Sequence, residues 1–210
     1  MNNYIIDLFT DNKMVEKIQK RLPYLYHLAE LDSSRAGKIG MEVGSLREKI
    51  IVSLLLYKYG EDNVETDIPI TEPEVDVKLF GKPISIKTIT CTKLSGVKLV
   101  WTVDAQKAQE FLEHYFPCCD ILLVQIDWNK IGSFYYIPLE SQIRVFKELG
   151  SEGYIKLPKQ GTNPRGAEFT NEALSKLTTD KETREIKIEW IKQDINYSPY
   201  KRWIDYWSEE

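Results

Sequence analysis

Residues 74–88 read EVDVKLFGKPISIKT, in which apolar and polar side chains alternate around a central glycine. Alternation with a period of two is typical of β-strands that bury one face. We expect a β-hairpin with Gly81-Lys82 as its two-residue loop, because glycine at the first loop position suits a type II′ turn. In that register Asp76 lies directly opposite Lys87 on the polar face of the two strands.

The segments around this hairpin predict an α/β fold with a mixed central β-sheet flanked by helices. Strands are expected at 64–70, 74–80, 83–90, 97–102, 119–127, 133–138 and 185–190. Helices are expected at 13–31, 45–59, 103–116, 139–149 and 170–178, with an aromatic-rich helix at the end of the sequence. No repeat or linker-like tract interrupts this order, so we expect a single domain over residues 1–210.

Two of the expected helices carry signals that bear on their ends and their continuity. Pro23 predicts a break or kink in helix 13–31, because proline lacks the backbone N–H that a helix interior requires. Ser45 and Glu48 match the capping-box pattern at the start of helix 45–59, and Gly60 is a typical stop signal.

The composition limits the kind of metal site that the chain can hold. Its 28 Lys and Arg residues against 32 Asp and Glu residues give a net charge of −4. With two histidines and three cysteines, and no CxxC pair, the sequence offers no histidine-rich or zinc-type site. Any metal would be held by carboxylates. No signal peptide or membrane-spanning run is recognisable, so we expect a cytoplasmic protein.

The charges are unevenly distributed around the hairpin. Seven acidic residues and no basic residue lie between Glu61 and Val77, and five lysines and no acid lie between Val77 and Val103. Carboxylates for a cation beside lysines for phosphates are what a metal-dependent phosphodiesterase needs. Two solvated faces that neutralise each other would give the same pattern.

Three residues near this change of charge are candidates for hydrolytic chemistry. Asp76 can bind Mg²⁺, which usually takes one or two carboxylates and keeps several waters. Lys87 can orient or deprotonate an attacking water, and Glu48 is the best candidate for a second carboxylate. The alternatives are a structural Asp76–Lys87 ion pair and a purely capping role for Glu48.

These residues resemble the PD-(D/E)xK nucleases, and among them the ThaI-like type II restriction endonucleases. The matching pattern is an acid on a helix, Glu48, then Asp76 on a strand, then Ser85-Ile86-Lys87 on the next strand. Val75 replaces the usual proline and Ser85 replaces the usual acid. In ThaI-like enzymes the helix glutamate supplies that missing carboxylate.

The resemblance implies a Mg²⁺-dependent, sequence-specific double-stranded DNA endonuclease with a nuclease-like core. It implies Glu48, Asp76 and Lys87 as catalytic residues, and a metal held by Glu48, Asp76 and the carbonyl of Ile86. It further implies that Met41 inserts into the minor groove, although Met41 could also pack in the core. A short CG-only palindrome such as CGCG, and a companion DNA methyltransferase in the host, follow from the same resemblance. A palindromic site calls for a homodimer.

Other residues are candidates for DNA contacts. Asn163 and Arg165 lie in a turn-rich loop, where arginine can make the commonest specific contact to guanine, or can simply be solvated. Lys93 and Lys98 suit phosphate contacts or an ordinary soluble surface.

Several alternatives remain open at this stage. Asp76-Val77-Lys78 and the segment 185–187 also match the short acid-x-Lys pattern. A structure-specific nuclease of the same fold would share the site, and a non-catalytic DNA-binding protein on a decayed nuclease fold would keep only the scaffold. The aromatic cluster at 203–207 could anchor a dimer or the core, and we favour the core.

Overall fold

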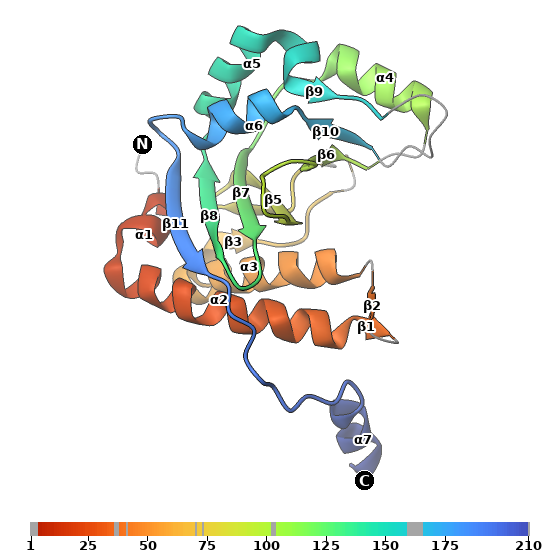
Figure 1. The fold of residues 1–210 in the computed structure, drawn as a ribbon. Coiled ribbons are helices and arrows are strands. Elements are labelled where there is room, and N and C mark those ends of the chain that lie inside the picture. Colours follow the sequence, from red (N-terminus) through yellow and green to blue (C-terminus); the bar gives the residue numbers. More distant parts are fainter. Residues whose placement is uncertain are drawn as a thin grey trace.

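A computed structural model gives the fold of residues 4–35, 38–40, 42–69, 71–72, 74–101, 104–158 and 166–209 (Figure 1). A six-stranded sheet with strand order β11-β8-β7-β5-β4-β3 forms its centre. The strands are β3 (Val64–Glu65), β4 (Val77–Leu79), β5 (Lys82–Thr90), β7 (Asp120–Ile126), β8 (Ile131–Ile137) and β11 (Arg184–Glu189). Strands β5 and β7 run parallel and the other neighbours antiparallel. The predicted mixed sheet is therefore confirmed.

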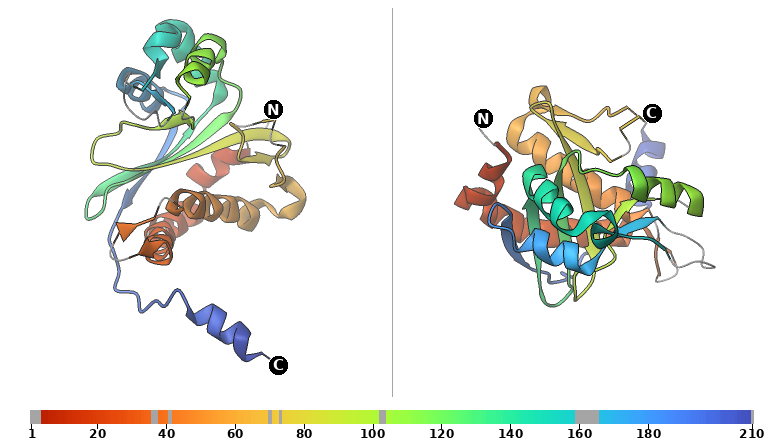
Figure 2. Two further views of the ribbon diagram at one scale, coloured as in Figure 1. Left: turned by 90° about the vertical axis from the view of Figure 1, so that its right-hand side faces the viewer. Right: turned by 90° about the horizontal axis from the view of Figure 1, so that it is seen from above.

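Helices cover both faces of this sheet, as Figures 1 and 2 show. One face carries α1 (Asp7–Thr10), α2 (Asn12–Asp32) and α3 (Val43–Tyr59). The other carries α4 (Ala105–His114), α5 (Leu139–Tyr154), α6 (Asn171–Thr178) and a small sheet of β6 (Lys98–Val100), β10 (Ala167–Phe169) and β9 (Ile155–Lys156). A short hairpin, β1 (Ser34–Arg35) with β2 (Lys38–Ile39), links α2 to α3. Each layer encloses its own apolar core.

The β4–β5 hairpin forms, but its register differs from the expected one by two residues. The observed pairs are Val77 with Ile84 and Leu79 with Lys82, so the loop is Phe80-Gly81. Both loop residues have positive φ, 50° and 74°, as a type I′ turn requires. The shift of two residues keeps every side chain on its predicted face, because side chains alternate with a period of two.

Phe80 is held in its unfavourable backbone conformation by contacts from outside the hairpin. Its ring centroid lies 4.2 Å from that of Tyr4 and 5.8 Å from that of Tyr59. Its N–H also donates to the carbonyl of Asn63 at 2.8 Å. Long-range packing therefore selects a turn that the local preference for glycine does not reveal.

The prediction about the start of α3 is wrong. Helix α3 begins at Val43, after an N-cap Glu42 whose side chain makes no capping bond. Ser45 therefore lies inside the first turn, and Glu48 is not engaged in a capping box. Helix α2 runs from Asn12 to Asp32 with Pro23 in its interior. The chain does not break there, because the buried face of the helix packs against the sheet and outweighs one lost hydrogen bond, and the alternative of a kink stays a prediction.

The C-terminal part also differs from expectation. Helix α5 extends to Tyr154 across a non-helical Gly150. Helix α7 (Lys201–Ser208) has no buried residue, so the prediction that its aromatic cluster packs in the core is wrong. No helix in the described part of the chain is long and apolar enough to cross a membrane.

The hairpin turn gives a test of the backbone conformation at Gly81. Substituting Gly81→Ala places a Cβ on a residue with φ of 74°, and we expect a loss of about 1–2 kcal/mol in unfolding free energy. Urea denaturation followed by circular dichroism measures it.

Gly44→Ala is the matched control, since a Cβ there meets no atom within 4 Å. Gly44 lies inside α3, so alanine should leave stability unchanged or raise it by about 0.5–1 kcal/mol. Equal effects at the two glycines would contradict the positive φ of Gly81.

Candidate active site

A hollow of about 440 Å³ lies between the first turns of α3 and the chain that leads into β4. Its lining residues are Ser45, Glu48, Lys49, Val52, Ser53, Leu56, Thr66 and Asp76. Two of the predicted site carboxylates, Glu48 and Asp76, therefore share one hollow although they lie 28 positions apart in the sequence.

Asp76 is fixed by the backbone of the neighbouring strand. Its Oδ2 accepts hydrogen bonds from the N–H of Ile86 at 2.6 Å and from the hydroxyl of Ser85 at 3.2 Å. Its own N–H donates to the carbonyl of Ile84 at 3.0 Å. Hydrogen bonds to an ionised acceptor are among the stronger ones, so the carboxylate has a defined orientation. Ser85, which replaces the motif's usual acid, serves here as a hydrogen-bond donor to Asp76.

Asp76 does not face Lys87 directly, in contrast to the prediction. Continuing the observed register places Asp76 opposite Ser85, so the two charges are not a simple cross-strand pair. The Nζ of Lys87 instead donates to the carbonyl of Leu99 in β6 at 3.5 Å. Strand β6 lies on the sheet face that also carries α4, α5 and α6.

Glu48 interacts electrostatically with both of the other predicted catalytic residues. Burial is the main cause that raises the pKa of Glu48 to about 7, and the negative charge of Asp76 adds to it. The positive charge of Lys87 acts in the opposite direction. A pair of carboxylates that resist joint ionisation is suited to a cation, which relieves both burial and repulsion.

Glu74 is a further carboxylate near Lys87 that the sequence reasoning missed. Burial raises its pKa to about 7, and Lys87 again lowers it. Glu74 lies in a turn just before β4, so strand alternation does not place it, and its membership of the acidic stretch 61–77 was the signal that the sequence offered.

A buried ion pair holds the start of α3 beside this hollow. Arg47, the residue before Glu48, places Nη2 2.6 Å from Oε1 of Glu30 in α2, and both side chains are less than one-tenth exposed. The same Oε1 accepts from Nε1 of Trp128 at 2.8 Å, and Nζ of Lys192 lies 2.8 Å from Oε2. Arg47 also donates to Oγ1 of Thr90 at the end of β5. The network therefore joins α2, α3 and the strand that carries Lys87.

The remaining predicted residues are distributed as follows. Lys93 is exposed, and Lys98 forms an ion pair with Glu168. Met41, Asn163 and Arg165 lie outside the residues that the structure describes.

The two competing acid-x-Lys segments have other contacts. Lys78 pairs with Glu72 at 2.8 Å, which fits the idea that part of the acidic and basic stretches neutralise each other. Glu185 accepts from the hydroxyl of Ser133 at 2.6 Å.

The donor set of the hollow fits a hard divalent cation. Within the described residues, no group of three or more His, Cys, Asp or Glu side chains is arranged to hold a metal. Mg²⁺, however, is usually bound by one or two carboxylates and retains several waters. Glu48 and Asp76 provide that number of carboxylates.

Comparison with known proteins identifies the class of enzyme. A solved structure described as a restriction endonuclease in complex with substrate DNA is 62% identical, with a TM-score of 0.93 over 99% of this chain and 100% of that chain. Among curated proteins none matches. This structural match and the family model given next identify a type II site-specific deoxyribonuclease, an enzyme class that in general uses a divalent metal. The family model for restriction endonuclease ThaI matches residues 8–209, and the chain belongs to that family, which confirms the resemblance.

The buried ion pair gives a stability test. Glu30→Gln keeps the shape of the side chain but leaves the charge of Arg47 buried without compensation. We expect a loss of about 3–5 kcal/mol in unfolding free energy, measured by urea denaturation at neutral pH.

Glu148→Gln is the control, because Glu148 forms an ion pair of similar length, 2.7 Å, with Lys176 on the surface. Its loss should be below about 1 kcal/mol. If Glu30→Gln were as mild as this control, the network would not be the anchor of α3.

Proposed function

We propose that the chain is a Mg²⁺-dependent, homodimeric enzyme that cuts both strands of double-stranded DNA at a short CG-only palindrome such as CGCG. The observation that carries this proposal is the shared hollow of Glu48 and Asp76 beside Lys87, in a member of the ThaI family. The substrate DNA bound by the 62% identical neighbour supports DNA as the partner. Residues 1–210 would form one nuclease-like domain.

Glu48, Asp76 and the carbonyl of Ile86 would hold Mg²⁺. The hydrogen bonds from Ile86 and Ser85 support this role, because they engage Oδ2 of Asp76 and keep the carboxylate in one orientation. When bound, the ion polarises the phosphate and lowers the pKa of a coordinated water.

Lys87 would position the attacking water and stabilise negative charge on the phosphate. An ammonium group has three donors and no acceptor, so it can contact the water and a phosphate oxygen together. The neighbouring acids Glu48 and Glu74 support this role, since each interacts with the charge of Lys87.

DNA recognition would use residues around the site. Lys93 and Lys98 would contact phosphates, and Asn163 and Arg165 would contact base edges in the major groove. Met41 would insert between base pairs from the minor groove, where the pyrimidine–purine step CG unstacks readily. Lys98 would have to exchange its ion pair with Glu168 for a phosphate.

A palindrome presents two scissile phosphates related by a two-fold axis, so two copies of the chain would act together. An enzyme with this activity would work in the cytoplasm beside a DNA methyltransferase that protects the host genome. That methyltransferase is a companion of the system and not a physical partner.

Asp76→Ala and Lys87→Ala test the assignment. Each variant should abolish cleavage of plasmid DNA in Mg²⁺ while retaining DNA binding in a gel-shift assay. Sequencing the ends that the unaltered protein produces reads out the recognition site.

Lys78→Ala is the matched control, because Lys78 belongs to the competing Asp76-Val77-Lys78 pattern and pairs with Glu72 instead. It should cleave normally. Retained cleavage in Lys87→Ala, or lost cleavage in Lys78→Ala alone, would reject the assignment.

The raised pKa of Glu48 predicts how Mg²⁺ dependence varies with pH. Glu48 is protonated below its pKa of about 7 and ionised above it, and a metal ligand must be ionised. Apparent Mg²⁺ affinity should therefore fall about tenfold between pH 8 and pH 6, measured from cleavage rates at limiting Mg²⁺.

Glu48→Gln should abolish cleavage yet raise the melting temperature of metal-free protein at pH 8. An acid whose pKa is raised on folding loses its stabilising contribution as pH rises from its usual pKa of 4.5 through 7, and glutamine avoids this loss. Glu74→Gln, with the same pKa shift, is the control and should leave the pH dependence of Mg²⁺ affinity intact. A lower melting temperature for Glu48→Gln would refute the electrostatic argument.

A further inference from the structure

The chain ends in an arm that leaves the body of the protein. After β11, residues 191–197 form no helix or strand, and helix α7 projects away from α2 in both side views (Figures 1 and 2). Large apolar side chains of this arm are exposed: Tyr200 by 70%, Trp203 by 52%, Ile204 by 61% and Trp207 by 90%. Their spacing of three, four and seven positions places them on one face of the helix. An exposed apolar face of this kind marks an interaction site.

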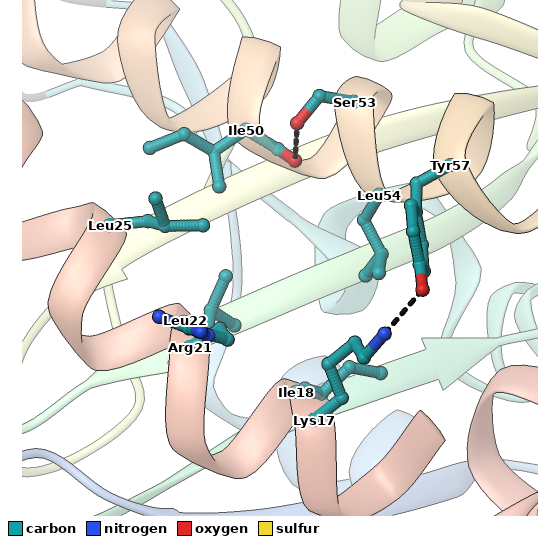
Figure 3. Close-up of a pocket in the computed structure, with 9 residues that line it drawn as sticks. All are labelled: Lys17, Ile18, Arg21, Leu22, Leu25, Ile50, Ser53, Leu54 and Tyr57. Carbon is teal, nitrogen blue, oxygen red and sulfur yellow. Dashed lines mark hydrogen bonds between the residues drawn. The ribbon is translucent and has the colours of Figure 1, made fainter. Parts of the chain in front are cut away.

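A matching groove runs along the outer side of α2 and α3. One hollow, of about 290 Å³, is shown in Figure 3, where Leu22 and Leu25 of α2 face Ile50 and Leu54 of α3. A second hollow, of about 400 Å³, shares Leu25, Ile50 and Ser53 with the first. The two hollows therefore form one continuous, largely apolar groove.

The arm begins at one end of this groove. The hydroxyl of Tyr197 donates to Asp32 at the end of α2, and both Tyr197 and Arg202 line the second hollow. The far end of the groove carries the cations Lys17 and Arg21.

We propose that two copies of the chain exchange their arms, so that α7 of each copy lies in the α2–α3 groove of the other. The apolar face of α7 would cover Leu25 and Ile50, and its C-terminal end would point toward Arg21 and Lys17. Helix polarity fits this direction, because a helix C-terminus is partially negative and its N-terminus, placed near Asp32, is partially positive.

The geometry favours a second copy over the chain's own helix. Residues Ser198–Tyr200 already form the turn that directs α7 outward, where the N–H of Lys201 donates to the carbonyl of Ser198 at 3.3 Å. The chain's own α7 does not cover the groove: Arg202 is the one described residue of the helix that lines the second hollow, and Trp203 and Trp207 remain 52% and 90% exposed. Exchange of identical elements is a low-cost route to a symmetric dimer.

The contact area is sufficient for a dimer. A fully covered aromatic side chain buries about 150–250 Å², so the exposed face of one arm can bury roughly 500 Å². Two arms and the two grooves that receive them would then bury about 2,000 Å² in total, which is in the range of stable interfaces.

The exchange would also bring two active sites together. Lys49 and Ser53 line both the groove and the hollow that holds Glu48 and Asp76. A partner helix in the groove therefore lies on the face of α3 next to the site. In this respect the inference rests on the proposed homodimeric nuclease and gives it an interface.

Cysteine cross-linking tests the exchange without reference to cleavage. In a Cys118→Ser background, Trp203→Cys is made in one preparation and Ser53→Cys in another, and the two are mixed and oxidised with diamide. Exchange predicts a covalent dimer on a non-reducing gel, with mass spectrometry identifying the 203–53 link. If the introduced cysteines at positions 203 and 53 stay unlinked in the mixture, so that only monomer appears on the gel, the proposal is overturned.

The double variant, with both cysteines in one chain, separates exchange from folding back. Exchange predicts covalent dimers, and a link formed within single chains overturns it. Asp205→Cys, on the opposite face of α7, is the control and should not link to Ser53→Cys. Adding Lys87→Ala should leave the cross-link unchanged, so a failure of the proposed catalytic roles is distinguishable from a failure of the exchange.

Discussion

The placement of Glu48 in the candidate active site depends on one buried ion pair, Glu30 with Arg47. An ion pair in the interior contributes little net stability, because desolvation offsets the attraction. The ion pair instead fixes the positions of the two side chains, because either charge would be strongly unfavourable in the interior without the other. Arg47 therefore fixes the rotation of α3 about its axis, and the next residue, Glu48, is directed toward Asp76. Glu30 also accepts a hydrogen bond from Trp128 and forms an ion pair with Lys192. The connection after β7 and the segment after β11 are therefore held to the same carboxylate as α3.

Much of the fold follows from local patterns in the sequence. Alternation predicted which residues of the hairpin face the core, and that assignment holds although the register moved by two residues. A shift of two is invisible to a burial pattern, because it moves no side chain to the other face. The choice of Phe80-Gly81 as the loop depends on Tyr4 and Tyr59, which lie far away in sequence. No local rule contains that information.

The candidate site, like the fold, could be predicted from the sequence only in part. Residue type and spacing predicted Glu48, Asp76 and Lys87 as site residues. In the structure Glu48 and Asp76 line one hollow, and Lys87 interacts electrostatically with Glu48. The capping-box reading of Ser45 failed because the helix begins two residues earlier, at Val43, and helix ends are poorly specified by sequence. Trp203 was assigned to the core from its apolar character alone. A single chain cannot show that such a residue is reserved for a contact outside its own body.

The raised pKa values of Glu48 and Glu74 have a consequence for the encounter with DNA. Near neutral pH, each acid spends about half of its time uncharged when its pKa is about 7. The region around Glu48 and Glu74 then carries less negative charge than the sequence alone suggests. A protein with a net charge of −4 can thus approach a polyanion with reduced local repulsion, and the full negative charge of this region would develop only when a cation arrives to balance it.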